Sequence, residues 1–394
     1  MKYKISIAIL TVSIAIASCK KDVIEHKVEV PSINETNYVT LKSGVVVEKS
    51  GSDYLLQGDI LLTDDQFRLL DTEGILERPN ENNSTFHNQI QVAGISGTSS
   101  IPRSQNKSVG VHPYENRMWA MVRYVVNPNL SWGARQSLSE ALLEIEATTN
   151  IRFYNATGKP VYDSQYNFYY PYIEFFHATG TTGWNKAGNR SAVGRSDAIK
   201  NYRDHGRNDA GQWLSLQQDY FNFSVPKSIV IHEVGHAIGL YHEHTRPDRD
   251  NFITVHQDRI NRDLLDDAGI KANYEPIKGN YYMIGNLDFN SIMMYGAFDF
   301  AKNKNIPVIT LKGSEQTYSN NAEKLSTSDR AYINRFYLPY IARSDIYAEL
   351  APVVYDANNN VLTPNERLNL QARLNNGNPY PPNCCRIPNS HTNL

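Results

Sequence analysis

The most regular hydrophobic pattern lies in the middle of the chain. Residues 118–126 are rich in strand-forming side chains, and residues 151–154 and 172–176 share that character, so each segment predicts a strand. A helix is expected between the first two, after the N-cap residue Ser131. Apolar residues at helical spacing form its buried face: Ala134, Leu138, Ala141, Leu142 and Ile145. The order strand, helix, strand predicts a sheet with a crossover helix.

Two further helices are expected later in the chain. One covers residues 226–239, because the proline at its start suits the first helical turn. The other begins at Ser326, and Asp329 three positions later makes a weak capping box. Its inward-facing residues would be Ile333 and Phe336.

The region before this pattern is more polar. Residues 20–77 contain short strand-like patches, such as residues 44–47. Residues 79–108 are rich in Asn, Ser and Gly and have no apolar period, which is typical of an exposed linker. This linker contains Arg103 and Lys107, both open to a trypsin-like protease.

The tail beyond Pro339 is rich in Asn and Pro, and its composition favours a flexible extension or a sorting element. It carries Cys384 and Cys385, two of the three cysteines of the chain. These neighbours would form a local disulfide or remain thiols, and two cysteines alone are not expected to hold a metal.

The N-terminus has the pattern of an export signal. Two early lysines precede an apolar run at residues 5–17, and small residues precede Cys19. The run is too short to span a bilayer as a mature helix. Residues 16–19 resemble the lipobox of bacterial lipoproteins, in which Cys19 would be lipidated; an ordinary secretory signal is the alternative. We therefore expect an exported protein, either membrane-anchored through Cys19 or secreted.

Length and charge narrow the range of partners. A chain of 394 residues can form two or three modules or one large core. Its 39 basic and 41 acidic residues give a net charge of −2, so nucleic acid is not expected as the main partner.

The chemistry concentrates in HEVGHAIGLYHEHTR, which begins at His232. His232 and His236 are four residues apart, so on a helix their imidazoles lie on one face and can hold one zinc ion. Glu233 lies beside them and can take a proton from a water at the metal.

A third ligand requires the helix to stop. If the helix continued, His242 would point away from the ion. Gly239 can adopt the left-handed conformation that ends a helix and returns the chain, bringing His242 to the metal. Three imidazoles leave one position open, as in a catalytic zinc site. His244 is left to cap or hydrogen-bond nearby, and a non-catalytic zinc clip is the alternative for the whole stretch.

The stretch HEVGHAIGLYHEHTRPDRD resembles the signature HExxHxxGxxHExxRxDRD of the astacins, a branch of the metzincin zinc endopeptidases. Further similar segments follow in the family's order: residues 131–153, 172–175, 191–195 and 288–295. The likeness covers roughly residues 117–340. It implies an α+β, metzincin-like zincin fold, with a twisted, mainly parallel sheet, long helices above the cleft and an irregular lower subdomain.

The resemblance also implies residue roles. Glu233 would be the general base and acid, and Met293 would form the apolar floor beneath the metal. Tyr295 would bind the zinc in the resting enzyme and swing away to stabilise the tetrahedral intermediate, as a phenol can donate to an oxyanion. The implied zinc ligands, for one catalytic ion, are His232, His236 and His242.

This sequence departs from the family at several positions. The family usually has four cysteines in two disulfides in this domain, and here there are none. Asn150 stands at one usual cysteine position, and Pro339 occupies the region of its partner. We expect a lower thermal margin without lost chemistry. Met294 stands where the family usually has histidine.

The segment Leu56-Gln57-Gly58-Asp59 resembles the FxGD motif of astacin propeptides. The resemblance implies that Asp59 binds the zinc in the zymogen and displaces the catalytic water; a turn aspartate is the alternative. Activation would be cleavage within residues 79–117. The new N-terminus would then insert and pair with Glu243.

These observations predict four regions: an export signal (1–19), a propeptide and linker (20–108), a catalytic domain (109–340) and a C-terminal extension (341–394). The expected function is a zinc endopeptidase that hydrolyses extracellular proteins and is made as a latent zymogen. The alternative is a non-catalytic, zinc-containing surface binding protein such as an adhesin.

The expected partners are an activating protease and protein or peptide substrates, which would bind along the edge strand at residues 191–195. If Cys19 is lipidated, cleavage would also free the protease from the membrane. Several astacins favour acidic residues just after the cleaved bond. The lysines that could supply positive charge for such residues are Lys302, Lys304 and Lys312.

Overall fold

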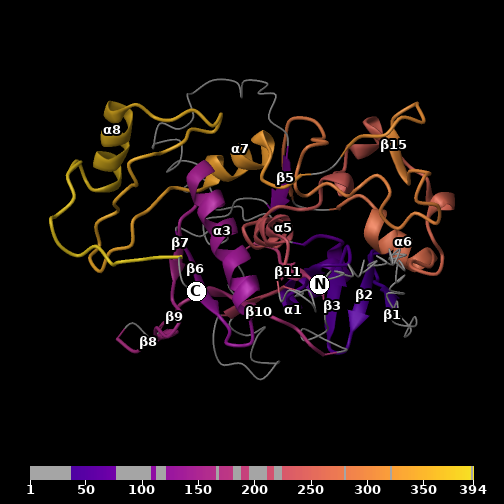
Figure 1. The fold of residues 1–394 in the computed structure, drawn as a ribbon, viewed down its shortest axis with the longest axis horizontal. Helices are drawn as coiled ribbons and strands as arrows, with labels where there is room; N and C mark the ends of the chain where they lie inside the picture. The colour runs from indigo at the N-terminus through magenta and orange to yellow at the C-terminus, as the bar shows by residue number, and fades with distance from the viewer. Residues whose placement is uncertain are drawn as a thin grey trace, which may run out of the picture. The chain divides into compact units, whose positions relative to one another are not determined.

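Nine strands from two distant parts of the chain form one sheet, in the order β1-β2-β3-β4-β11-β12-β10-β6-β7. Figure 1 shows this arrangement in the structure, a computed structural model. The described residues are 37–76, 108–111, 121–165, 168–180, 188–194, 211–216, 224–278, 281–319, 322–391 and 394. The expected export signal, lipobox and most of the linker lie outside them.

The strands of residues 122–215 form the part of the sheet that the sequence predicts. They are β6 (Val122–Val126), β7 (Phe153–Asn155), β10 (Tyr172–Phe176), β11 (Arg190–Ala192) and β12 (Gly211–Ser215). Three of their four neighbouring pairs are parallel and only β11 runs antiparallel to β12. The expected α+β fold with a mainly parallel sheet is confirmed.

Two long helices pack on this sheet and on each other (Figure 1). Helix α3 (Trp132–Thr148) begins after Ser131, whose hydroxyl accepts from the Ala134 amide. The five apolar residues expected on its inner face are all buried. Helix α5 is Lys227–Ala237, with Pro226 as N-cap. Helix α7 (Thr327–Phe336) has the expected capping box of Ser326 and Asp329. The main core lies between these helices and the sheet.

Residues 243–278 and 281–319, here called the lower part, form the expected irregular subdomain. It contains α6 (Asp267–Tyr274), β13 (Ile253–Val255), β15 (Ile309–Leu311) and three single-turn 3₁₀ helices. Helix α6 and strand β15 of this part lie on the right in Figure 1. Further short pairs are β5 (Ser108–Val111) with β14 (Tyr281–Ile284) and β8 (Tyr162–Asp163) with β9 (Phe168–Tyr169). A separate apolar cluster, which includes Tyr274 and Met294, stabilises this part.

Residues 37–76, here called the N-terminal lobe, are more ordered than the sequence suggests. They contain β1 (Asn37–Thr40), β2 (Val46–Ser50), β3 (Asp53–Leu56), β4 (Ile60–Leu61) and α1 (Asp64–Glu73). The helix was missed, although Thr63 and Gln66 form a capping box at its start. Strand β4 pairs in parallel with β11, so the lobe extends the catalytic sheet.

The sequence analysis expects a flexible extension after Pro339, and for the described residues this expectation is wrong. The extension contains α8 (Pro364–Leu374), with Thr363 and Glu366 as a capping box, and a small apolar cluster of its own. In Figure 1, α8 lies at the opposite end of the view from α6 and β15. Cys384 and Cys385 form a disulfide. Polar side chains make many of the contacts of this segment. Its sequence therefore has low hydrophobicity and gave no sign of an ordered structure.

One such contact replaces the missing cysteine. Asn150, fully buried, accepts from the Tyr355 amide and donates to the Tyr355 and Asn334 carbonyls. Its own amide donates to the Asn334 side chain at 2.6 Å. These hydrogen bonds of Asn150, here called the node, therefore join the end of α3, helix α7 and the C-terminal extension without a covalent bond.

The last residues of the chain also pack on the sheet. The His391 ring lies 2.8 Å from the Tyr124 hydroxyl and 3.0 Å from a Glu146 oxygen. Asn389 accepts from the Asn155 amide at the free edge of β7. Such contacts cover an edge that would otherwise invite pairing. Among the described residues no helix is long and apolar enough to cross a membrane.

Replacement of Asn150 tests this node. Asn150→Ala should lower the free energy of unfolding by about 1–3 kcal/mol, because it leaves buried backbone groups without partners. The exposed Asn358→Ala serves as the matched control and should change it little. Urea denaturation measures both; equal stabilities of the two variants would contradict a structural role of the node.

Candidate metal centre

The end of helix α5 brings the third histidine back to the first two. Gly239 has φ 113°, and the amides of Gly239 and Leu240 donate to the carbonyls of His236 and Gly235. These two bonds form a Schellman motif, which satisfies the last helical carbonyls while the chain reverses. The helix stops there, as expected, and His242 returns beside His232 and His236.

Three imidazoles and one carboxylate converge at this point. The His242 Nε2 atom lies 3.1 Å from an Asp59 oxygen, and the Nε2 atoms of His232 and His236 lie at 3.6 and 3.7 Å. One ligand atom from each of the four residues lies within 4.8 Å of the others. The structure thus brings the three histidines and the distant aspartate together.

The other ring nitrogens settle the orientation of each imidazole. The Nδ1 atoms of His232, His236 and His242 lie at 2.9, 2.8 and 3.1 Å from the oxygens of Ile292, Leu240 and Gln57. Each partner is an acceptor, so each Nδ1 carries the hydrogen and each Nε2 is directed to the shared point.

This shared point favours a cation. The Nε2 atom of His236 and one oxygen of Asp59 are buried and have no hydrogen-bond partner among the described residues. Burial lowers the pKa of His236 and lowers that of His242 to about 4, so both remain neutral. Burial also acts on His232, but the Asp59 and Glu233 carboxylates raise its pKa to about 9. The same carboxylates that hold a proton on His232 would favour a metal cation in its place, and three imidazoles with a carboxylate fit Zn²⁺.

Asp59 reaches the site from the N-terminal lobe through a strained turn. Gln57 and Gly58 both have positive φ, 58° and 88°. A β-carbon on Gly58 would lie 2.8 Å from the Asn273 side chain, so glycine is required there. The Asp59 carbonyl then accepts from the Ser191 amide of β11.

Glu233 lies beside the cluster and is nearly fully buried. One of its carboxylate oxygens has no hydrogen-bond partner in the described part of the chain. Burial, and then the negative charge of Asp59, hold its pKa well above the usual value. A carboxyl group in this environment binds a proton readily, as a general base must.

Tyr295 is directed to the N-terminal lobe. Its hydroxyl donates to the Gln57 carbonyl at 3.1 Å, and its ring stacks on His244 at 3.8 Å. His244 itself bonds the Asn273 carbonyl through Nε2 at 3.0 Å. Burial raises the Tyr295 pKa well above its usual range, so the phenol stays a donor.

Met293 packs beneath the helix that carries the ligands. A β-carbon on Gly235 would lie 2.7 Å from the Met293 sulfur, so the two elements are in close contact. The Met293 carbonyl accepts from the Glu243 amide. Met294, at the position where the family usually has histidine, is buried in the apolar cluster of the lower part.

Glu243 is buried next to the Arg246 guanidinium, and only one of its two carboxylate oxygens has a hydrogen-bond partner among the described residues. One of its oxygens accepts from the Arg246 guanidinium and the Asp288 amide, at 3.3 and 2.9 Å. The other is buried without a partner among the described residues. Burial raises the Glu243 pKa to about 8. Arg246 also donates to the Ser108 carbonyl in β5.

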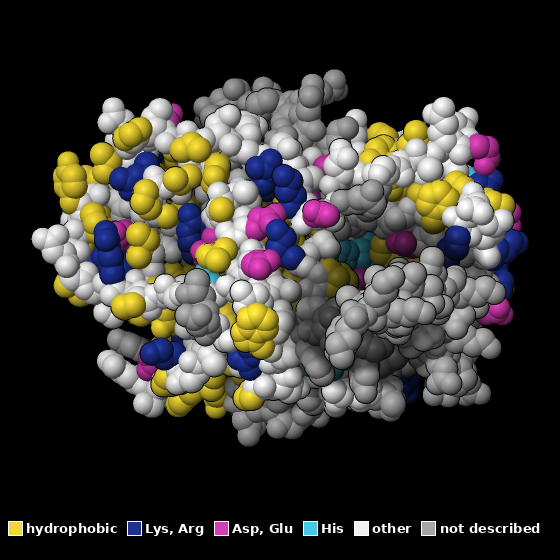
Figure 2. Space-filling view, in the orientation of Figure 1, with side chains coloured by type: hydrophobic (Ala, Val, Ile, Leu, Met, Phe, Trp, Pro, Cys, Tyr) yellow, Lys and Arg dark blue, Asp and Glu magenta, His cyan; other side chains and the backbone are white. Residues whose placement is uncertain are grey.

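A cleft of about 450 Å³ runs past the ligands, lined by Asp59, Asn189, Ile229, Glu233 and Tyr295 among others. In Figure 2 histidine surface (cyan) is visible in a recess of the displayed face. No lysine is among the described residues that line the cleft. Lys302 instead donates to the Asp258 carbonyl, and Lys304 lies near Asp299.

The cation near the reaction centre is Arg190, which the sequence analysis missed. The register of β4 with β11 pairs Ser191 with Ile60, so Arg190 stands opposite Asp59. Burial lowers the pKa of its guanidinium. Four carboxylates oppose that shift, those of Glu48, Glu233, Asp59 and Asp53. No motif marks this arginine, because its neighbours come from the distant lobe.

Comparison with known proteins finds similar peptidases. The model of the peptidase family Astacin matches residues 111–338. Flavastacin of Elizabethkingia meningoseptica is 30% identical over 207 residues, 52% of this chain and 36% of that protein. Zinc metalloproteinase nas-7 of Caenorhabditis elegans is 30% identical over 224 residues, 56% of this chain and 48% of its own. The chain thus matches less than half the length of each.

Among solved structures, high choriolytic enzyme 1, a hatching enzyme zinc-protease from Oryzias latipes, is 21% identical, with a TM-score of 0.41. The match covers 61% of this chain and 98% of that one.

Metal analysis of the purified protein tests the ligand set. The wild type should contain about one zinc ion per chain. Loss of an outer-sphere partner alone weakens metal affinity about 10–100-fold, so His236→Ala should weaken it further. His244→Ala keeps the ligands and serves as the control. Elemental analysis and chelator competition measure both; equal zinc retention by the two variants would contradict the ligand assignment.

Proposed function

The chain belongs to the astacin family of peptidases, and we propose that it is a zinc-dependent endopeptidase made as a latent precursor. The observation that carries this proposal is the convergence of His232, His236, His242 and Asp59, with Glu233 beside them. A site that serves only structure has no use for a buried base.

Each residue has a chemical task in this proposal. When bound, zinc would acidify a water and polarise the scissile carbonyl. Glu233 takes the proton from that water and passes it to the leaving amine. Tyr295 donates a hydrogen bond to the oxyanion once its hydroxyl leaves the Gln57 carbonyl. The backbone of β11 holds the extended substrate by main-chain hydrogen bonds.

Latency follows from the N-terminal lobe. Asp59 would take the coordination position that the catalytic water needs. Strand β4 already pairs with β11, the strand along which substrate would lie. Gln57 holds the Tyr295 hydroxyl at the same time. Three requirements of catalysis are therefore blocked by one short segment.

Activation would be a cleavage within residues 79–117. The unpartnered oxygen of Glu243 supports insertion of the new N-terminus, because a buried carboxylate oxygen accepts an ammonium group well. Ser108 lies close by, since its carbonyl accepts from the Arg246 guanidinium that also contacts Glu243. A cut just before Ser108 would bring the amino group near that oxygen.

We place the protein outside the cytoplasm, acting on extracellular proteins, on the strength of the N-terminal signal pattern. Cys19 within a lipobox-like sequence would anchor the precursor to a membrane. Substrates, the activating protease and the anchor all belong to this proposal.

Casein cleavage before and after limited trypsin tests the enzyme and its latency. The precursor should be inactive, and activity should appear once trypsin has cut the linker and the lobe has dissociated or been digested. Glu233→Gln, a side chain of equal size, should lower the rate about 10²–10⁴-fold, which is the contribution of general acid–base catalysis. Asp59→Ala relieves one of the three blocks, because β4 still pairs with β11 and Gln57 still holds Tyr295, so it should show only a small part of the processed activity without trypsin. A wild-type precursor with full activity would contradict the Asp59 switch, and no activity in any state with zinc bound would favour a binding protein.

Arg190 gives a prediction about substrate choice. After the lobe leaves, its guanidinium would lose three of its four carboxylate neighbours, so acidic substrate side chains near the scissile bond should be favoured. Processed wild type should prefer Glu over Gln peptides about tenfold in kcat/KM, and Arg190→Gln should lose that preference. The distant Arg262→Gln should keep it. Equal cleavage of both peptides by the wild type would contradict this role.

A further inference from the structure

The N-terminal lobe and the catalytic part share one hydrophobic core. The catalytic part contributes four buried residues: Val109, Val193, Tyr241 and Ile277. The lobe contributes seven: Leu41, Val47, Leu56, Ile60, Leu62, Leu70 and Leu76. Burial of this kind is the main favourable contribution to association, so the shared core acts as a large apolar interface.

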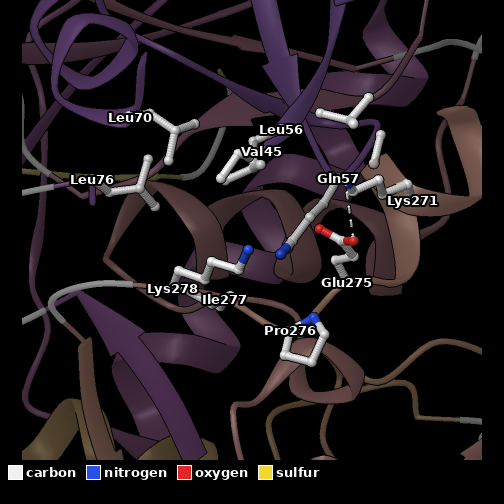
Figure 3. Close-up of a pocket in the computed structure, with 12 residues that line it drawn as sticks. Val45, Leu56, Gln57, Leu70, Leu76, Lys271, Glu275, Pro276, Ile277 and Lys278 are labelled. Carbon is white, nitrogen blue, oxygen red and sulfur yellow. Dashed lines mark ion pairs between the residues drawn. The ribbon is translucent and has the colours of Figure 1, made fainter. Parts of the chain in front are cut away.

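Apolar side chains from the two sides meet at this interface. Figure 3 shows Val45, Leu56, Leu70 and Leu76 of the lobe facing Pro276 and Ile277. A small cavity of about 30 Å³ lies between them.

Backbone pairing adds to the apolar contact. Strand β4 pairs with β11, and the Ser191 amide donates to the Asp59 carbonyl at 3.0 Å. Removal of the lobe would expose β11 as an unpaired edge, which favours renewed pairing with the same partner.

A third contact joins the lobe to helix α6. A β-carbon on Gly269 would lie 2.9 Å from the Tyr38 ring, so that ring sits directly against the helix backbone. The Tyr38 hydroxyl also bonds the Asn273 side chain. This contact is distant from the proposed activation cleavage and depends on the absence of a side chain at Gly269.

Cleavage of the linker would remove none of these contacts. The lobe has no cysteine in residues 37–76, so it is joined to the catalytic part covalently by the linker alone. The shared core, the β4–β11 pairing, the Asp59 carboxylate and the Tyr38 contact all lie outside the linker. The cut chain therefore keeps the whole interface.

We propose that the N-terminal lobe stays docked after cleavage, as a non-covalent inhibitor whose binding surface is β11, helix α6 and the four apolar residues of the catalytic part. This inference rests on the proposed function and adds a step to activation, the release of the lobe after cleavage. Cleavage alone does not open the cleft, and the lobe has to dissociate or be digested. Any anchor on the N-terminal side would hold the cut protease at the membrane until then.

Retention on a resin tests the docking without any activity measurement. The chain from residue 20 onward carries an affinity tag at its N-terminus and a recognition site for a sequence-specific protease in place of residues 103–107; it is bound to resin and cut with that protease at neutral pH. The fraction of the C-terminal fragment that stays on the resin is followed over repeated washes by gel electrophoresis. The wild-type fragment should remain bound long after the linker is fully cut.

Gly269→Leu is the matched perturbation. Leucine suits a helix better than glycine, so α6 itself is not weakened, but the side chain collides with the Tyr38 ring. The cut fragment should leave about tenfold faster, because interface changes act mainly on dissociation rates. Gly269→Leu with Tyr38→Ala removes the collision and should restore part of the retention. Glu140→Leu, on the exposed face of α3, should behave as wild type.

The outcomes separate this inference from the proposed function. Release of the wild-type fragment in the first wash, or equal release by wild type and Gly269→Leu, would overturn the docking. Retention with the expected order of variants supports it, whether or not the protein cleaves casein. Absence of peptidase activity in the fully digested sample would count against the proposed function alone.

Discussion

The structure depends on the meeting of three imidazole nitrogens and one carboxylate at a single buried point. Each histidine is fixed by a hydrogen bond at its other nitrogen, two of them to backbone carbonyls and the third to Gln57. Atoms so arranged would repel one another without a cation between them. The Schellman turn at Gly239, the packing of Met293 under α5 and the buried Glu243 all serve to hold this geometry.

The same point joins the N-terminal lobe to the histidine-bearing part of the chain. Gln57 accepts from His242, holds the Tyr295 hydroxyl with its carbonyl, and leads into Asp59. Strand β4 then continues along β11, where a substrate would lie. One segment of a few residues thus contacts the three histidines, Tyr295 and β11 together. In the proposed function, latency would be a property of this geometry and of the core behind it.

If the resemblance places Asn150 at a cysteine position correctly, the C-terminal extension takes a structural part that a disulfide would otherwise have. Asn150 stands at a usual cysteine position and joins α3, α7 and Tyr355 by hydrogen bonds. His391 and Asn389 cover the β7 end of the sheet. A hydrogen-bonded node constrains the folded state, whereas a disulfide mainly constrains the unfolded chain. The two solutions therefore stabilise the same corner in different ways.

Local patterns in the sequence determined the elements that act alone. The N-caps at Ser131 and Ser326, the buried face of α3 and the helix stop at Gly239 depend on residues within one or two turns. Contacts between distant segments were decided only by the tertiary structure. Arg190 gains meaning only opposite Asp59, and the tail after Pro339 owes its order to polar contacts that leave no hydrophobic period. Burial against a distant surface has no local signature, so the contacts of the lobe beyond Asp59 and the docking of the tail could not be predicted.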